Sequence, residues 1–234
     1  MALSFYVRLP GSLRGMLMMF VSTMSAVFMH TLVRYAAEDL EPFEVAFFRN
    51  FLGLAFLAPL FLRTNVSALK TDRLPLHILR NVLVTASMLS FFTALTITPL
   101  AQVTALGFTA PLFATLLAIL FLGEVVRFRR WAAIITGFAG VFVLLRPGLG
   151  AVDLGSVLTV FSALMWGAAI IITKKLSRTE SSLTITFYMA AIMAPLSLIP
   201  ALWAWEWPTG AQWSLLFAIA GFGTITQLCF SQAL

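Results

Sequence analysis

Charged residues are scarce in this chain. Asp, Glu, Lys and Arg make up 10% of its 234 residues, whereas hydrophobic residues make up 61% and the mean hydropathy is +0.99. Soluble domains carry roughly 25% charged residues. A chain with so few charges cannot cover a globule with polar surface, so a water-soluble fold is excluded and lipid is the expected solvent for most of the exterior.

Residues for catalysis and metal binding are equally few. The single cysteine, Cys229, excludes an internal disulfide framework and a Cys-rich metal site, and the chain has only two histidines and nine acidic residues. It has no HExxH zinc motif, no Walker A phosphate loop and no GxSxG elbow. We therefore predict neither an enzyme nor a bound metal or cofactor.

The basic residues do not predict a nucleic acid partner. The net charge is +6, but Lys and Arg occur in short clusters between apolar runs, which is the pattern of membrane topology. Arg8 and Arg14 precede an apolar run of roughly 18 residues or more without a small-residue cleavage site, which predicts a retained first helix rather than a signal peptide.

Apolar runs long enough to cross a bilayer dominate the sequence. Crossing the hydrocarbon takes about 20 residues of helix, and the runs lack the alternating pattern of barrel strands. The sequence thus predicts an all-α polytopic membrane protein. Its eight expected helices are residues 16–33, 43–62, 76–97, 101–122, 131–145, 154–173, 183–203 and 213–233.

The positions of Lys and Arg predict the orientation. If the N-terminus is cytoplasmic, only Arg34, Arg49 and Arg146 lie toward the other face. The remaining twelve basic residues then fall on the cytoplasmic side: Arg8, Arg14, Arg63, Lys70, Arg73, Arg80, Arg127, Arg129, Arg130, Lys174, Lys175 and Arg178. This asymmetry follows the positive-inside rule and predicts a multi-pass protein of the cytoplasmic (inner) membrane.

The sequence also indicates an internal repeat. An offset of about 140 residues matches residues of the first and sixth expected helices, and one residue of slippage matches the third with the eighth. The matched pairs are Gly15 with Gly155, Ser22 with Ser162, Arg34 with Lys174, Ser87 with Thr226, and Ser90 with Cys229. Because the offset is five helices, the second copy enters the membrane from the opposite side, which is the inverted repeat of secondary transporters. A duplication without a transport role remains the alternative.

The repeat predicts two domains, residues 1–148 with five helices and residues 149–234 with three. By the same offset, the second copy is expected to continue past Leu234 into two more helices. We therefore expect eight helices of a ten-helix (5+5) fold, truncated at the C-terminal end.

Three stretches carry a family resemblance. They are "EPFEVAFFRNFLGLAFLAPLFL", the long segment "FFTALTITPLAQVTALGFTAPLFATLLAILFLGEVVRFRRWAAIITGFAGVFVLLRPG", and "MWGAAIIITKK". The chain resembles the EamA-type branch of the drug/metabolite transporter superfamily over essentially its full length. The resemblance implies ten helices in two five-helix repeats, a central substrate cavity and no ATP hydrolysis.

Arg49 is the first candidate for substrate binding. It lies several residues inside the second expected helix, where an unpaired charge costs about 2.5 to 3.5 kcal/mol, so we expect it to face a wet cavity or a partner. Its guanidinium is suited to hold a carboxylate or phosphate bidentately. The alternatives are snorkelling to the interface, or an ion pair with Glu44 or Glu41. Asn50 beside it is expected to hold helices together.

His30 and Arg80 are further candidates on the first and third expected helices. His30 is suited to proton coupling, with simple packing as the alternative. Arg80 shares its helix face with Ser87 and Ser90 and is expected to face a cytoplasmic vestibule, unless it only anchors the helix at the interface.

The fourth expected helix and the second copy complete the candidate cavity. Gln102 and Thr104 begin the fourth helix and Pro111 is expected to interrupt it, which is either a substrate-binding break or a static kink.

In the second copy, Trp166, Tyr188 and Gln227 offer surfaces for stacking on a solute, with ordinary packing as the alternative.

These features favour a secondary transporter that moves a small organic metabolite by alternating access. Proton coupling and a homodimer are left open, and the expected partners are a small-molecule substrate and the lipid bilayer. The competing hypothesis is a non-transporting membrane scaffold or degenerate transporter fragment. The identity of the substrate does not follow from the sequence.

Overall fold

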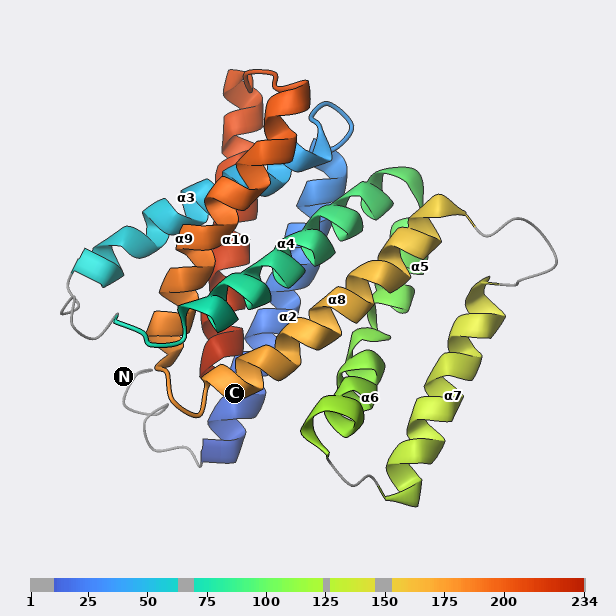
Figure 1. Cartoon of the computed structure of the whole chain (residues 1–234). Helices are drawn as coiled ribbons and strands as arrows, with labels where there is room; N and C mark the ends of the chain where they lie inside the picture. The colour runs from blue at the N-terminus through green and yellow to red at the C-terminus, as the bar shows by residue number, and fades with distance from the viewer. Residues whose placement is uncertain (1–10, 63–69, 124–126, 146–152, 234) are drawn as a thin grey trace.

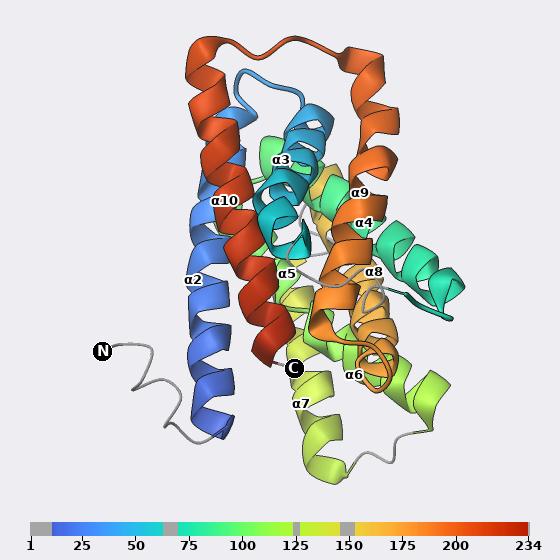
Figure 2. The ribbon, with the colours of Figure 1, turned by 90° about the vertical axis from the view of Figure 1, so that its left-hand side faces the viewer.

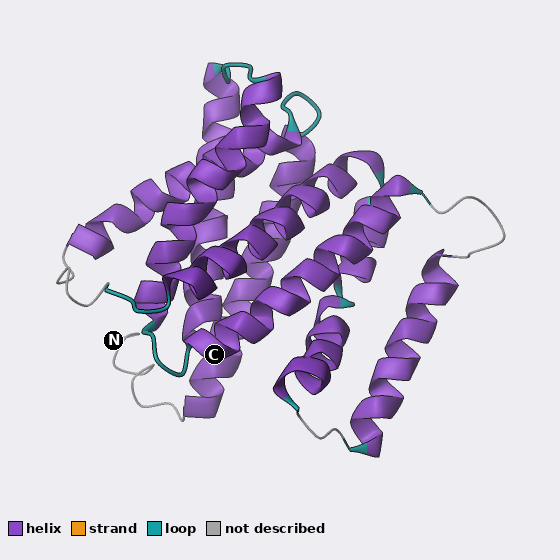
Figure 3. Cartoon of the chain, in the orientation of Figure 1, coloured by secondary structure: helices purple, strands orange, loops and turns teal. Residues whose placement is uncertain are grey.

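The computed structural model describes residues 11–62, 70–123, 127–145 and 153–233. Every regular element in these ranges is helical (Figure 3), and each expected apolar run except the fourth corresponds to one α-helix. The elements are α2 Gly11–Ala36, α3 Pro42–Leu62, α4 Leu74–Ile97, α5 Leu100–Gly107, α6 Ala110–Leu122, α7 Phe128–Leu145, α8 Leu154–Leu176, α9 Ser182–Ala201, the 3-10 turn η2 Leu202–Ala204, and α10 Gly210–Ala233.

The fourth expected helix is divided in two. α5 ends at Gly107, and α6 begins at Ala110 after a break at Phe108 and Thr109. Pro111 lies in the first turn of α6, where a missing backbone N–H is tolerated. The interruption near Pro111 that the sequence predicts is therefore present, and the proline begins a new helix rather than bending a continuous one.

Six of these helical segments are long and apolar enough to cross a membrane, with α5 and α6 taken together. α3, which carries Glu44 and Arg49, and α7, which carries Arg129 and Arg130 in its first turn, are not among the six. The structure thus supports a polytopic membrane protein with six candidate spans, and membrane crossing by α3 and α7 stays a prediction.

The helices pack in pairs (Figures 1 and 2). α2 runs along α10, α4 runs along α8, and α3 packs against α9. The core between the pairs contains fully buried side chains such as Val33, Leu95 and Ile219. α7 lies at the periphery, against α5 and α6.

Two of these helix pairs are joined by similar polar contacts. Ser22 Oγ of α2 donates to the carbonyl of Thr226 in α10 at 2.9 Å, and Thr226 Oγ1 donates to the carbonyl of Ser22 at 3.5 Å. Ser87 Oγ of α4 donates to the carbonyl of Ser162 in α8 at 2.9 Å, and Ser162 Oγ donates back to the carbonyl of Ser87 at 2.7 Å. Small hydroxyl residues allow the backbones to approach closely.

Asp153 connects α8 to the end of α4. Its carboxylate caps α8 by accepting from the backbone N–H of Ser156 at 3.0 Å, and it accepts from Thr98 Oγ1 at 2.6 Å and Gln102 Nε2 at 3.1 Å. Hydrogen bonds from Ser156 and Thr98 lower the pKa of Asp153 from 3.8 to about 2.

Arg34, at the last turn of α2, lies at the same end of α4. Its guanidinium donates to the carbonyls of Leu95 and Thr98, at 2.6 and 2.8 Å. Thr98 therefore touches the ends of both α2 and α8, so these contacts fix the point at which α4 gives way to α5.

Candidate functional site

Two arginines lie inside the helix bundle, and each is followed by an asparagine. Arg49 and Asn50 belong to α3, and Arg80 and Asn81 belong to α4. Arg80 is 1% exposed, whereas Arg49 is half-buried. Buried cations in a membrane bundle are costly, so their surroundings identify the candidate site.

Arg49 is held by neutral groups and has one donor to spare. Its Nη1 donates to Asn50 Oδ1 at 2.8 Å and contacts Met88 Sδ of α4 at 3.3 Å. Asn50 Nδ2 in turn donates to Ser197 Oγ of α9 at 3.1 Å. Arg49 Nε has no partner among the described residues. Among the residues that the structure describes, Arg49 forms no ion pair with Glu44 or Glu41, the alternative that the sequence offered. The charge of its guanidinium is therefore not balanced by a carboxylate in the described ranges.

The space beside Arg49 is bounded by α2 and α10. A side chain at Gly223 of α10 would place its Cβ 2.9 Å from Arg49 Nε and 3.2 Å from Met29 Sδ, so the missing side chain makes room for the arginine. His30 of α2 lies within electrostatic range of Arg49, and its ring centroid is 4.8 Å from that of Phe91. His30 and Arg49 are therefore neighbours among helices α2, α3, α4 and α10, and a substrate cavity shared by the two residues stays a prediction.

Arg80 is enclosed more completely. Its Nε donates to Thr173 Oγ1 of α8 at 2.7 Å, its Nη1 to Asn81 Oδ1 at 3.2 Å, and its Nη2 faces Met189 Sδ of α9 at 3.8 Å. Asn81 Nδ2 donates to the carbonyl of Tyr188 at 3.2 Å. The expectation of a cytoplasmic vestibule at Arg80 is wrong for this conformation, because α8 and α9 cover its side chain.

Two further contacts close the same end of the bundle. The ring of His77 lies 4.6 Å from that of Tyr188 and is fully buried, with no partner for either ring nitrogen among the described residues. Thr71 Oγ1 donates to Glu180 at 2.6 Å. Tyr188 thus packs against a histidine of the protein in a tilted arrangement, and the start of α4 is closed against the turn between α8 and α9.

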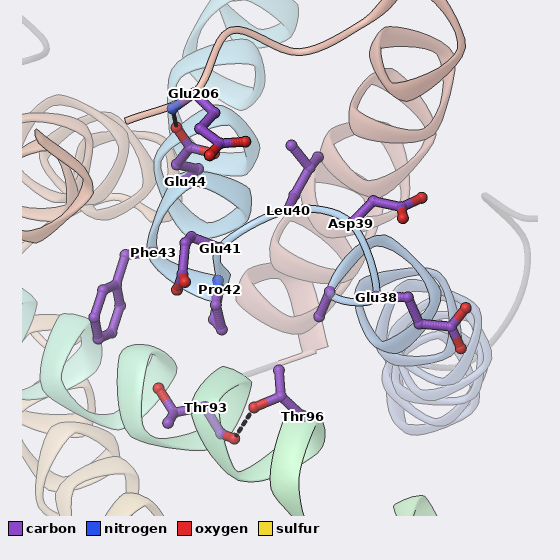
Figure 4. A pocket seen from close by; sticks show the side chains of 11 residues that line it. Glu38, Asp39, Leu40, Glu41, Pro42, Phe43, Glu44, Thr93, Thr96 and Glu206 are labelled. Atoms are coloured by element: carbon purple, nitrogen blue, oxygen red, sulfur yellow. Dashed lines mark hydrogen bonds between the residues drawn. The ribbon is translucent and has the colours of Figure 1, made fainter. Parts of the chain in front are cut away.

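The opposite end of the bundle contains an acidic cavity of about 420 Å³ (Figure 4). It opens where the α2–α3 turn meets the connection between α9 and α10. Its acidic lining residues are Glu38, Asp39, Glu41, Glu44 and Glu206. Glu44 is fully buried: one carboxylate oxygen accepts from the backbone N–H of Glu206, and the other has no partner in the described chain. Glu44 precedes Arg49 by five residues on α3, which is about 7.5 Å of helix rise.

The remaining predicted residues on α4 to α6 lie outside these two groups. Ser87 joins α4 to α8, and Ser90 is half-buried on α4. Gln102 joins the contacts around Asp153, and Thr104 Oγ1 donates to the carbonyl of Leu100 in its own helix at 2.7 Å. Pro111 is exposed.

The second-copy candidates also lie apart. Trp166 packs against Phe230 with 6.1 Å between ring centroids, and Gln227 is buried on α10. The structure therefore places His30 within electrostatic range of Arg49, and it links Arg80 to Tyr188 through Asn81, which bonds to the Tyr188 carbonyl.

Sequence reasoning missed the partners of both arginines. The guanidinium of Arg49 contacts Met88 and lies against Gly223. The guanidinium of Arg80 contacts Asn81 and Met189. The repeated Arg–Asn dipeptide was the available signal, since it occurs inside two apolar helices.

A bundle of membrane-length helices with cations in its interior is the arrangement found in helical membrane transporters. The EamA-like transporter family matches residues 13–146 and 153–234, so the chain belongs to this family and the predicted resemblance is confirmed. Membership in a transporter family also fits the prediction that the protein is not an enzyme.

Three relatives are named for the solutes they move. The chain is 35% identical over 192 residues to an S-adenosylmethionine uptake transporter of Rickettsia felis, covering 82% of this chain and 65% of the relative. It is 36% identical over 188 residues to a riboflavin transporter of Rhizobium johnstonii, covering 80% and 62%. A pseudopaline exporter of Pseudomonas aeruginosa is 27% identical over 222 residues, covering 94% and 78%.

A solved crystal structure shares the fold. Its TM-score is 0.65 at 20% sequence identity, with 95% of this chain and 79% of that chain covered. The likeness extends over nearly the whole helix bundle described above.

Proposed function

We propose that the protein is a secondary transporter that carries a small organic metabolite across the cytoplasmic membrane by alternating access. The observation that carries this proposal is Arg49, a guanidinium without a carboxylate partner in the described chain and with a spare Nε donor. Its contact Met88 is the fifteenth of the 24 residues of α4, so Arg49 lies near the middle of the bundle. Transporters bind their substrates at this depth.

The cavity that we propose contains Arg49 and His30, with Met88 and Gly223 as its walls. Its access route is the acidic cavity, which lies further toward the α2–α3 end of the same helices. Proton coupling through His30 stays a prediction. The named relatives, which move metabolites, support transport of a small solute by this chain.

We also propose that the fold is an inverted repeat, with residues 1–148 and 149–234 as its two copies. The contacts between helices support this. The sequence offset matches Ser22 with Ser162 and Thr226 with Ser87, and the structure pairs Ser22 with Thr226 and Ser162 with Ser87. Each hydroxyl contact is thus the counterpart of the other, as a two-fold axis in the membrane plane requires.

The proposed orientation places the N-terminus and the α8–α9 turn in the cytoplasm. Single cysteines in a Cys229→Ser background at Arg73, Arg129 and Lys175 test it. A membrane-impermeant maleimide added to intact cells should label none of the three until the membrane is opened. Labelling of one position but not another from outside would contradict the topology.

Uptake by proteoliposomes tests the transport function. The purified chain is reconstituted, and entry of radiolabelled S-adenosylmethionine and riboflavin, the solutes of the named relatives, is measured. Arg49→Gln should lower uptake by at least about tenfold, because it removes the charge at mid-depth. Arg129→Gln is the matched control, since Arg129 is exposed at the start of α7. Failure of the wild-type protein to carry either solute would favour the scaffold hypothesis.

A further inference from the structure

The Arg49–Asn50 and Arg80–Asn81 pairs are built alike. In each pair an arginine Nη1 donates to the Oδ1 of the next residue, at 2.8 and 3.2 Å. In each pair the guanidinium also touches a methionine sulfur, Met88 at 3.3 Å or Met189 at 3.8 Å.

Both pairs are also anchored to the same helix. The asparagine Nδ2 reaches α9 in both cases, at Ser197 Oγ and at the Tyr188 carbonyl. Helices α3 and α4 therefore present the same arrangement of groups twice.

Neither guanidinium has a carboxylate partner in the described chain. Their acceptors are an amide, a hydroxyl and thioether sulfurs, which leave the formal charge uncompensated. A buried cation without an anion is unfavourable, so repeating the arrangement would be costly if it only held helices together. An anionic group that visits both sites would account for the repetition.

The two pairs differ in access. Arg49 is half-buried and keeps Nε free, whereas Arg80 is 1% exposed with its three nitrogens engaged. Arg80 precedes Met88, the neighbour of Arg49, by eight residues on α4, which corresponds to about 12 Å along the helix. One site therefore is partly exposed and has an unused donor, whereas the other is sealed, and the two lie at different depths of the bundle.

The acidic cavity constrains the ligand further. Five carboxylates line the approach on the Arg49 side, and this field attracts cations and opposes net anions. A ligand that passes it and binds a guanidinium must carry both signs of charge. An amino-acid-like solute, with an ammonium or other cationic group and one carboxylate, meets both conditions.

We propose that Arg49–Asn50 and Arg80–Asn81 are successive binding sites for the carboxylate of an amphoteric, amino-acid-like substrate. Arg49 receives the carboxylate from the acidic cavity, and Arg80 receives it when the α8–α9 end opens. This inference rests on the proposed transport function. Of the solutes carried by two named relatives, S-adenosylmethionine has a carboxylate and cationic groups, whereas riboflavin has no carboxylate.

The test compares S-adenosylmethionine with its decarboxylated analogue, which differs only by the carboxylate. Binding to the purified full chain is measured by thermal shift, and uptake is measured in proteoliposomes. The wild-type protein should bind S-adenosylmethionine at least about tenfold more tightly than the analogue, because the charged pair with Arg49 is lost. Arg49→Met should abolish that difference.

Arg80→Met should separate binding from uptake. Binding of S-adenosylmethionine should stay within about twofold of wild type, because Arg80 is sealed, while uptake should fall at least about tenfold. Arg129→Met is the matched control and should leave both within about twofold. The melting temperature without ligand should not fall in Arg80→Met, whereas a purely structural arginine would lower it in step with uptake, and that result would overturn the proposal.

Other outcomes separate this inference from the proposed function. Uptake of riboflavin that neither arginine variant changes would leave the transporter standing and overturn the carboxylate sites. Equal binding of the two S-adenosylmethionine forms would do the same. A wild-type protein that moves no solute would overturn both proposals. If Arg80→Met shows no cooperative melting, Arg80→Lys takes its place as the test. The proposal requires that this variant has reduced uptake and still takes up S-adenosylmethionine in preference to the decarboxylated analogue. Equal uptake of the two compounds would refute it.

Discussion

Arg49 and Arg80 have similar sequence neighbours, but the helices around them enclose the two guanidinium groups to different extents. At Arg49 the facing residue on α10 is Gly223, and Nε is left without a partner in the described chain. At Arg80 the facing residues are Thr173 and Met189, and both contact the guanidinium. The comparison shows that the helices around a buried charge, rather than its own sequence neighbours, decide whether it is accessible.

The same difference extends to the two ends of the bundle. The α2–α3 end has a cavity of about 420 Å³ lined by acidic residues. The α8–α9 end is closed by the packing of His77 against Tyr188 and by the hydrogen bond from Thr71 to Glu180. Under the proposed alternating-access mechanism, this difference between the two ends would correspond to one half of the cycle.

The largest expected effect is a difference in how much the burial of Arg80 and of Arg49 destabilises the folded protein. Arg80→Met should raise the free energy of unfolding by roughly 2 to 3 kcal/mol, because an enclosed cation without an anion is replaced by an apolar side chain of similar length. Arg49→Met should raise it less, because Arg49 is only half-buried. Thermal unfolding in detergent measures both. An equal gain in the two variants would erase the distinction between sealed and open sites.

The seal around Arg80 depends on its hydroxyl acceptor. Thr173→Val removes that acceptor and leaves the Nε donor buried and unpaired, which should cost about 2 kcal/mol of stability. Ser197→Ala, the corresponding change behind Asn50, removes only a neutral hydrogen bond and should cost about 1 kcal/mol. The same unfolding assay ranks them. A larger loss for Ser197→Ala would show that the Arg49 side is the more tightly built.

Gly223 offers a way to close the open site. A methyl group there would meet Arg49 Nε at 2.9 Å, so Gly223→Ala should displace the guanidinium and weaken binding of S-adenosylmethionine about tenfold, or about 1.4 kcal/mol. Gly221→Ala is the control on the same helix, where the nearest atom lies 4.0 Å away. Isothermal titration compares the two variants. Equal affinities would mean that Arg49 does not occupy the ligand site.

The smallest effect concerns the contact between α4 and α8 at Asp153. Hydrogen bonds lower the pKa of Asp153 to about 2, so the carboxylate contributes its full stabilisation above about pH 4 and loses it as the pH falls toward 2. The melting temperature should therefore decline slightly in this window in the wild-type protein, and less steeply in Asp153→Asn. Parallel pH profiles would assign the decline to other groups. The Arg80 seal contains no carboxylate and should not respond in this range.

The sequence was sufficient for those features that depend on a single helix. Hydrocarbon length predicts each helix, Pro111 predicts the break of the fourth, and a charge inside an apolar run singles out Arg49. The repeat matches Ser22 with Ser162 and Ser87 with Thr226, but it does not predict that Ser22 bonds to Thr226 and Ser87 to Ser162.

Features that depend on helix rotation did not follow from the sequence. Arg80 was expected at a vestibule, yet α8 and α9 cover it, and no local pattern predicts which helices will surround a given face. Gln102 was expected in the cavity but bonds to Asp153, because the turn at Thr98 between α4 and α5 places the first turn of α5 beside the start of α8. Contacts between distant segments determine both outcomes.

The reciprocal hydroxyl contacts have a mechanical consequence. Hydrogen bonds from serine hydroxyls to backbone carbonyls join α2 to α10 and α4 to α8. Each of these two helix pairs is therefore expected to move as one rigid body. Separating the helices of either pair would break two hydrogen bonds at once, so relative motion is expected between the two pairs rather than within them. The asparagines that bond to the two arginines also bond to α9. A displacement of α9 relative to these pairs would therefore alter both charged sites together.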